Sequence, residues 1–90
     1  MNYNQILKEG ENFLKKNKIK NSYLDTELIL SKVTNKKREE ILLNTNFKLK
    51  DKDIIKFKNY LFRRHHKEPM AYILGYKHFW KHKFLTNKSV

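Results

Sequence analysis

The chain has no cysteine, one proline, two glycines and no long apolar run among its 90 residues. The absence of cysteine excludes a disulfide framework, a thiol nucleophile and any cysteine-based zinc or iron–sulfur site, and it fits a reducing compartment. No segment approaches the ~20 apolar residues that span a bilayer, and the first residues lack the pattern of a signal peptide. We therefore expect a cytoplasmic protein with no membrane contact.

The two glycines, Gly10 and Gly75, stand far apart, and this spacing excludes the common nucleotide-binding loops. A phosphate-binding loop needs G-x-x-x-x-G-K-[ST], and a dinucleotide turn needs G-x-G-x-x-G. Doubly wound pockets for S-adenosylmethionine also begin with a glycine-rich turn after a strand, so we expect this chain to bind no cofactor. The scarcity of glycine and proline also argues against a many-turned all-β domain and favours helices.

Charge of one sign dominates, because 21 basic residues against nine acidic ones give a net charge of +12. Such an excess is typical of proteins that bind RNA, the ribosome or an acidic protein surface. The alternative explanation is compositional, since an AT-rich genome enriches lysine, asparagine and isoleucine. Only three of the basic residues are arginine, the residue that supplies bidentate and stacking contacts to RNA. We therefore favour the compositional explanation and expect no specific nucleic-acid partner.

Apolar residues recur at helical spacing along most of the chain, whose length suits one small domain. The first helix is expected from Tyr3 to about Lys16, with Asn2 and Gln5 as a capping box. Gly10 lies on the apolar stripe of this helix. A residue without a side chain at that place indicates that a neighbouring helix approaches closely.

A second helix is expected from about Tyr23 to Val33, with Ser22 and Asp25 as its capping residues. Its apolar residues go most of the way round the helix. Such a helix is usually covered on several sides, so we expect it at the centre of the domain.

A third, short helix is expected next, capped by Thr34 or Asn35 and ending with the apolar residues 41–43. The polar loop that follows contains two isolated apolar side chains, Phe47 and Leu49. We expect both of them to plug the core.

The helix expected from about Asp51 to His66 separates its residues into two faces. Ile54, Phe57 and Leu61 share the face that must be buried, with His65 beside them as a packing residue. The opposite face carries a cationic stripe. This stripe is the candidate for contact with a partner, although a solubilising face explains it as well. The cationic stripe consists of Lys52, Lys56, Arg63 and Lys67.

Pro69 suits the first position of a further short helix, and Gly75 suits the residue just past its end. After Gly75 the helical pattern stops, and aromatic residues such as Phe79 and Trp80 indicate strands. A two-stranded piece is marginal alone, so we interpret residues 76–90 as the linker and first β-hairpin of a domain beyond this chain. The expected fold is mainly α: a small bundle of four to five short helices over residues 1–75, followed by that hairpin.

The histidines offer no convincing metal site. His78 and His82 have the spacing of a helical metal pair, but the pattern around them is extended. No carboxylate or cysteine stands nearby to complete a ligand set. His65 and His66 are adjacent and point to different faces of a helix. We therefore expect no metal.

The carboxylates offer no catalytic pair either, because they stand at helix starts or on solvated faces. We expect one arginine to form an ion pair instead, because Arg64 and Glu68 are four residues apart and can pair across the helix end. Arg64 can alternatively reach Asp25 in the second helix. An exposed pair would contribute only ~0.3–0.5 kcal/mol.

Two segments resemble a known family, the peptide-chain release factor glutamine methyltransferases (PrmC/HemK). That family joins its two domains by an arginine-rich helix end, then x-P-x-x-Y-I-x-G, then an aromatic strand pair. The stretch 25–30, DTELIL, is similar to the family's D-A-E-L-L-L helix, with Thr26 in place of alanine. The residues that match the join are Arg63, Arg64, Glu68, Pro69, Ala71, Tyr72, Ile73, Gly75, Phe79 and Phe84.

The resemblance implies that residues 1–75 are the substrate-recognition domain of a longer enzyme. Its missing Rossmann-like domain would bind S-adenosylmethionine and methylate the glutamine of the Gly-Gly-Gln motif in release factors. This chain would then be non-catalytic by itself, with the release factor and its own catalytic domain as partners.

Three alternatives remain open. The related family that methylates a ribosomal-protein glutamine shares much of the pattern. The charge alone favours a free-standing RNA- or ribosome-binding module. A purely structural domain would stabilise the catalytic half without touching any substrate.

Overall fold

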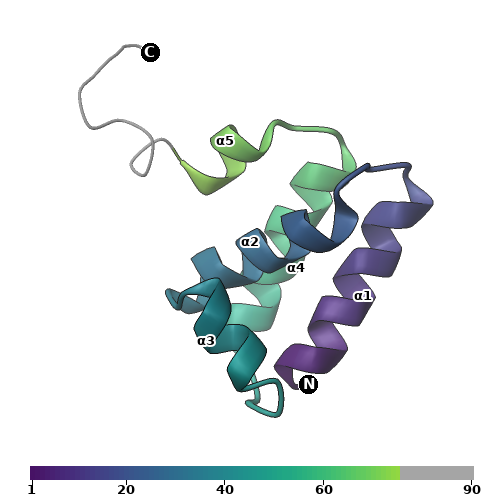
Figure 1. Cartoon of the computed structure of the whole chain (residues 1–90). Coiled ribbons are helices and arrows are strands. Elements are labelled where there is room, and N and C mark those ends of the chain that lie inside the picture. The colour runs from purple at the N-terminus through teal and green to yellow at the C-terminus, as the bar shows by residue number, and fades with distance from the viewer. Residues whose placement is uncertain (76–90) are drawn as a thin grey trace.

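Five helices make up the part of the chain that the structure, a computed structural model, describes, namely residues 1–75 (Figure 1). They form a small bundle, so the expected mainly α architecture is confirmed, and no strand occurs within residues 1–75. The predicted hairpin and the His78–His82 spacing lie outside the described residues. The helices are α1 (Tyr3–Lys16), α2 (Ser22–Thr34), α3 (Arg38–Leu43), α4 (Asp51–His65) and α5 (Met70–Leu74).

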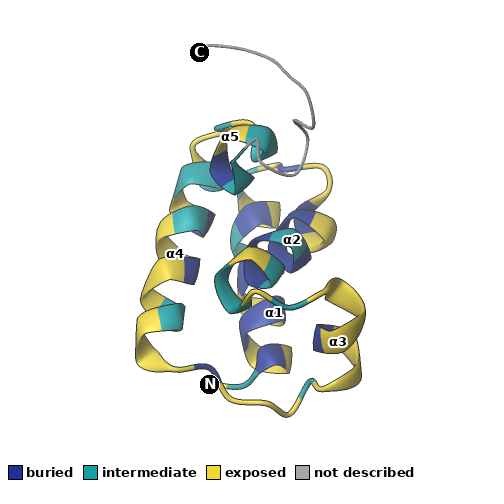
Figure 2. Cartoon of the chain, turned by 90° about the vertical axis from the view of Figure 1, so that its left-hand side faces the viewer, coloured by how far each residue is buried: buried dark blue, intermediate teal, exposed yellow. Residues whose placement is uncertain are grey.

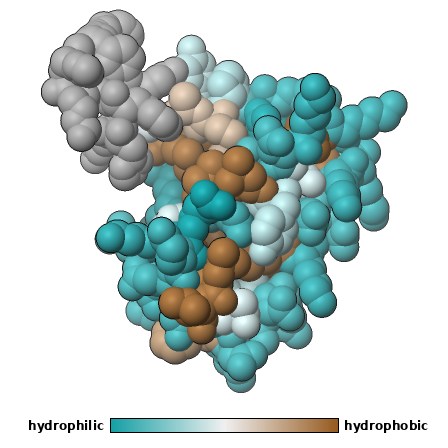
Figure 3. All heavy atoms as spheres, viewed as in Figure 1, coloured by the Kyte–Doolittle hydropathy of each residue, from teal (hydrophilic) through white to brown (hydrophobic). Residues whose placement is uncertain are grey.

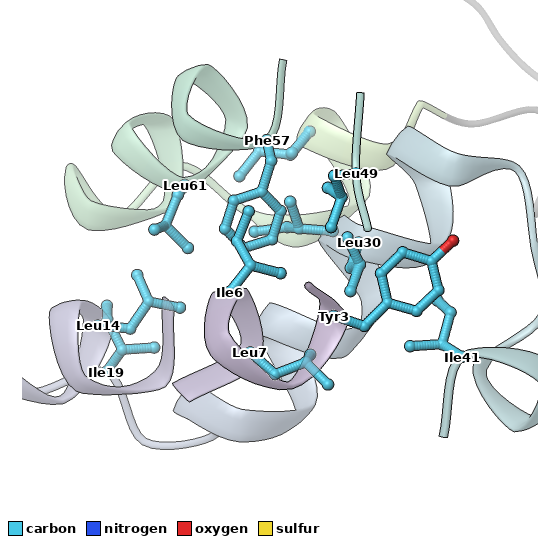
Figure 4. Close-up of a cluster of buried hydrophobic side chains, with 12 residues drawn as sticks. Tyr3, Ile6, Leu7, Leu14, Ile19, Leu30, Ile41, Leu49, Phe57 and Leu61 are labelled. Carbon is cyan, nitrogen blue, oxygen red and sulfur yellow. The ribbon is translucent and has the colours of Figure 1, made fainter. Parts of the chain in front are cut away.

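The core forms where α1, α2 and α4 meet (Figure 4). Side chains from the three helices, among them Ile6, Leu30 and Phe57, are fully buried and point toward one another. Helix α2 contacts each of the other four helices, which confirms its predicted central place. Its first turn is less covered than expected, because Tyr23 and Leu24 keep 43% and 38% of their surface exposed.

Helix α1 begins with the predicted capping box. The Gln5 amide N–H donates to Asn2 Oδ1 (2.8 Å), and the Asn2 N–H donates to Gln5 Oε1 (2.9 Å). Gly10 is buried where α1 passes α2, and a Cβ atom there would lie 2.5 Å from Thr26 Cγ2. The predicted close approach at Gly10 is therefore confirmed.

The predicted cap of α2 is wrong. Ser22 is the first residue of the helix rather than its cap; it is buried, and its carbonyl accepts a hydrogen bond from the Thr26 hydroxyl (2.7 Å). Asn21 precedes the helix without any capping bond from its side chain. Asp25 does not cap either, because its carboxylate is bound by Arg64.

The predicted cap of the third helix is also wrong. Thr34 and Asn35 end α2 instead: the Thr34 hydroxyl donates to the Leu30 carbonyl (2.8 Å), and Asn35 takes the left-handed conformation, with φ of 60°. Asparagine tolerates this conformation at helix ends better than most residues. Helix α3 starts later, where the Lys37 N–H donates to the Glu40 side chain (2.9 Å).

The loop between α3 and α4 runs beside the N-terminus. The amides of Tyr3 and Asn4 donate to carbonyls of this loop, at 2.9 and 3.0 Å, so backbone groups at the start of α1 are satisfied from outside the helix. Leu49 is buried, as predicted. The prediction for Phe47 is wrong, because the ring is 52% exposed and lies against the Tyr3 ring, with a centroid distance of 5.9 Å.

Helix α4 covers one side of the bundle, and its exposed residues follow the outer edge of the molecule (Figure 2). Phe57 and Leu61 are buried, as predicted, and Ile54 packs against the core. His65 is the expected packing residue, because its ring stacks on Phe13 with centroids 4.8 Å apart.

Helix α5 is tied to the core by Ile73, which is 2% exposed. Pro69 stands just before this helix rather than at its first position, which is Met70. Gly75 ends the helix with φ of 82°, a conformation that L side chains rarely adopt, and this confirms its predicted place.

Candidate functional site

The cationic stripe of α4 divides into two parts in the structure. Lys52 and Lys56 are exposed in the first turns of the helix, while Arg63 is half-buried and bound to Glu68. Lys67 lies beyond the helix end in a left-handed conformation (φ of 67°), and its ammonium group donates to the Asn17 carbonyl (3.2 Å). Of the four, Lys52 and Lys56 therefore have the side chains most available to a partner.

Arg63 of the stripe belongs to an arginine clamp, which Arg63 and Arg64 form around the turn that leads into α5. Arg63 Nε donates to Glu68 Oε1 (3.0 Å), and its Nη2 donates to the second carboxylate oxygen. This bidentate contact lowers the pKa of Glu68 and raises that of Arg63. The carboxylate of Glu68 thus pairs with Arg63, not with Arg64.

Arg64 reaches Asp25, which was the second of the two predicted possibilities. Its Nε donates to Asp25 Oδ2 (2.9 Å), and its Nη1 donates to the backbone carbonyl of Glu68 (2.8 Å). The Asp25 side chain is only 6% exposed and that of Arg64 22%. One arginine therefore joins α2, the end of α4 and the turn before α5.

A second buried carboxylate of α2, Glu27, holds an arginine from a different helix. Arg38 of α3 donates to Glu27 Oε1 through Nε (3.1 Å) and Nη2 (2.8 Å), and the Glu27 side chain is 4% exposed. The pKa of Tyr23 is raised, mainly because the side chain is partly buried and secondly because the negative charge of Glu27 is near it. This pair was not predicted from the sequence. The available signal was the position of Glu27 directly before the apolar residues 28–30, because a carboxylate needs a partner when it is buried.

The described residues, 1–75, contain no assembled metal site. No group of three histidine, cysteine, aspartate or glutamate side chains there is arranged to hold a metal ion. The rings of His65 and His66 are 5.0 Å apart between centroids; His65 stacks on Phe62, whereas His66 is tilted against it. Among the same residues, no helix is long and apolar enough to cross a membrane.

The described residues contain no glycine-rich turn of the kind that binds S-adenosylmethionine. Gly10 lies inside α1 against Thr26, and Gly75 ends a helix. Residues 1–75 therefore lack the turn on which a doubly wound S-adenosylmethionine pocket is built.

Comparison with known proteins identifies relatives over nearly the whole chain. The profile of the PrmC N-terminal domain family matches residues 5–75. The "Bifunctional methyltransferase" of Rickettsia felis is 37% identical over 86 residues, which cover 96% of this chain and 16% of that protein. The "Release factor glutamine methyltransferase" of Haemophilus influenzae is 38% identical over 81 residues, or 89% of this chain and 28% of the relative.

A third relative, the "Release factor glutamine methyltransferase" of Leptospira interrogans, is 31% identical over 94% of this chain and 30% of its own. The chain thus spans less than a third of the length of each of these relatives. No solved structure matches it. The family profile covers four of the five helices completely and nearly all of α1, including the arginine clamp and both buried carboxylates. On this basis the chain belongs to the PrmC N-terminal domain family.

Proposed function

We propose that residues 1–75 are the substrate-recognition domain of an S-adenosylmethionine-dependent methyltransferase. Its substrate would be the glutamine of the Gly-Gly-Gln motif of peptide-chain release factors. The observation that carries this proposal is the similarity over about nine-tenths of the chain to proteins named release factor glutamine methyltransferase. Release factors act in translation, so we place the protein in the cytoplasm.

A separate recognition domain has a clear physical advantage for such a reaction. A Gly-Gly-Gln tip offers few side chains, so it gives an enzyme little surface to recognise. A second contact on the same rigid protein raises the effective concentration of the tip at the catalytic site. Binding energy from that remote contact also supports positioning of the reacting group.

The exposed part of the cationic stripe supports a role in this recognition. Lys52 and Lys56 are one turn apart on α4, and both are exposed. Exposed charges at the rim of an interface mainly change the rate of encounter and the salt dependence of binding. We therefore assign Lys52 and Lys56 to steering, and Arg63 and Lys67 to the turn that precedes α5.

Calorimetry with the 90-residue chain and a bacterial release factor tests the proposal. We expect saturable binding that weakens several-fold in the Lys52→Glu/Lys56→Glu variant, together with a smaller salt dependence. Lys58→Glu reverses one exposed lysine of α4 outside the stripe; it is the control for a single charge reversal and should bind as the wild type does. Absence of binding to the release factor would contradict the proposal. Binding to a ribosomal protein in its place would favour the related methyltransferase family.

A further inference from the structure

Helix α4 carries apolar side chains on a second side, away from the core. Ile55 is 62% exposed and Phe62 56%, although Phe57 and Leu61 of the same helix are buried. Ile55 and Phe62 are seven positions apart with the exposed Asn59 between them, so all three lie within about 60° of one another around the helix. We call Ile55, Asn59 and Phe62 the outer ridge of α4. A surface helix normally has one apolar side, so a second one indicates a further contact.

The exposed ring of Phe62 is held in place by other rings. It stacks on His65 with centroids 5.9 Å apart, and His65 stacks in turn on Phe13 of α1, with centroids 4.8 Å apart. The His66 ring packs against Phe62 at 4.4 Å. A side chain that is fixed before a partner arrives loses little conformational entropy on binding. Aromatic anchors of this kind contribute much of the affinity of protein interfaces.

The charge beside the outer ridge is mainly positive. Of the exposed charged residues of α4, Asp51 is acidic, whereas Lys52, Lys56 and Lys58 are basic. The helical spacing places Lys52 and Lys56 along one edge of the ridge and Lys58 along the other. Asp51 lies in the first turn, where the helix dipole favours a carboxylate. The surface is therefore apolar along the ridge and most positive along the edge that carries two lysines.

We infer that the outer ridge binds an amphipathic helix of a protein partner, with carboxylates along one side of its apolar stripe. Side chains spaced three or four residues apart on one helix interlock with those of another helix. Apolar side chains of the partner would pack against Ile55 and Phe62, which stand about 10 Å apart along the axis of α4. Its carboxylates would meet Lys52 and Lys56. The inference rests on the proposed function, because we take this helix to belong to the release factor.

Charge argues against two other occupants of the outer ridge. A second copy of the chain would bring another net charge of +12, and juxtaposed like charges disfavour association. Residues 76–90 include four lysines and no acidic residue, so they offer no carboxylate to Lys52 and Lys56. An acidic helix of a separate protein matches both the apolar and the charged part of this surface.

The test measures the association and dissociation rates of the 90-residue chain with a bacterial release factor by surface plasmon resonance. Phe62→Ser and Ile55→Ser each remove one apolar side chain of the ridge. We expect binding about tenfold weaker for Phe62→Ser and several-fold weaker for Ile55→Ser, through faster dissociation at an unchanged association rate. Lys52→Glu/Lys56→Glu should instead mainly slow association, because charge acts on the encounter of the two proteins.

Leu43→Ser is the matched control, because it removes an exposed apolar side chain from another part of the surface. Helix α3 lies on the opposite side of the bundle from α4 in Figure 2, and Figure 3 shows hydrophobic surface over α3. Leu43 is 83% exposed, and we expect Leu43→Ser to bind within about twofold of the wild type. Thermal unfolding checks that the variants are folded. If Phe62→Ser loses part of its fold, Ile55→Ser carries the test.

The possible outcomes separate this inference from the proposed function. If the wild type binds the release factor and both ridge variants bind equally well, the ridge is overturned as a docking site while the proposed function stands. An equal loss of affinity for Leu43→Ser also overturns the inference, because the ridge would then have no special role. If the wild type does not bind the release factor at all, both proposals fall. If Phe62→Ser weakens only a complex with a single-stranded RNA homopolymer, the partner class is wrong, since an exposed ring can also stack on bases.

Discussion

Asp25 and Glu27 stand two positions apart on α2, and each binds an arginine from a different helix. Asp25 holds Arg64 of α4, and Glu27 holds Arg38 of α3. Both carboxylates are at least nine-tenths buried, so each would lose free energy of solvation without its partner. The motif that resembles D-A-E-L-L-L therefore places two anchors for neighbouring helices, separated by the small residue that faces α1.

Removing Arg64 tests the first of these anchors. We expect Arg64→Ala to lower the free energy of unfolding by about 2 kcal/mol, because Asp25 would remain buried without a partner. Urea unfolding followed by circular dichroism measures this change. Arg63→Ala is the control and should cost less, since Glu68 is more accessible to water than Asp25. Equal losses in the two variants would show that burial does not distinguish the bridges.

The bridge between Arg63 and Glu68 makes a prediction about pH. Its hydrogen bond holds the pKa of Glu68 below the usual value, so the charged form is favoured in the folded state. The stabilisation is therefore complete above the usual glutamate pKa and is lost as the pH falls through the lowered value. The wild type should melt at a higher temperature than Glu68→Gln at neutral pH, and the gap should narrow below about pH 4. Glu9→Gln, at an exposed position of α1, should show no such gap.

At the scale of elements, the approach of α1 to α2 depends on Gly10. Alanine is the better helix former by about 1 kcal/mol, so propensity alone predicts that Gly10→Ala stabilises the protein. The new Cβ would lie 2.5 Å from Thr26 Cγ2 and 3.1 Å from Phe57 Cζ, both within the core. Steric crowding of this kind typically costs about 1–3 kcal/mol, so we expect net destabilisation, measured by urea unfolding.

The double variant Gly10→Ala/Thr26→Ser isolates the cause. Serine removes the Cγ2 atom and keeps the hydroxyl that donates to the Ser22 carbonyl. Gly10→Ala should therefore be less destabilising in the Thr26→Ser background than in the wild type, by about 1 kcal/mol. An unchanged cost would show that the ring of Phe57, rather than Thr26, limits the approach of the two helices.

Element positions followed from the sequence far better than element ends did. The apolar spacing predicted the helices at Tyr3–Lys16 and 51–66 to within a residue, because that spacing reflects which side is buried. The caps of α2 and α3 were wrong, since Ser22 and Asn35 have polar side chains that suit several positions near a helix end. Which position they take depends on the chain path between helices, and local preference does not determine that path.

At the scale of the whole molecule, the large positive charge comes mainly from lysines, and the arginines are bound to carboxylates. All three arginines of the chain, Arg38, Arg63 and Arg64, are engaged with carboxylates inside the domain. The remaining basic residues are lysines, which attract phosphate mainly as point charges. This arrangement favours the compositional explanation of the charge over a specific RNA site.

RNA binding should accordingly be weak and indifferent to sequence. We expect fluorescence anisotropy with homopolymers of different bases to give similar affinities. These affinities should fall by about tenfold or more between about 50 and about 200 mM salt. The release factor serves as the comparison, because a specific protein contact would keep part of its affinity at high salt. A tight complex with one RNA sequence at physiological salt would instead support the RNA-binding module.

The sequence by itself determined the helical class, the inward faces of the helices, the capping box at Asn2 and the close approach at Gly10. These features arise from residues near one another in the chain, where the period of the helix dictates which side chains share a face. The match of residues 63–75 to the family pattern was likewise readable from sequence alone.

Only the tertiary structure decided which charges pair. Arg64 had two candidate partners, one four residues away and one 39 residues away. It binds the distant Asp25, because a buried carboxylate without a partner costs more free energy than an accessible one. The same holds for Glu27 with Arg38 and for the exposure of Phe47. Each of these features depends on the distance between helices that are far apart in the sequence, and a local sequence pattern does not determine that distance.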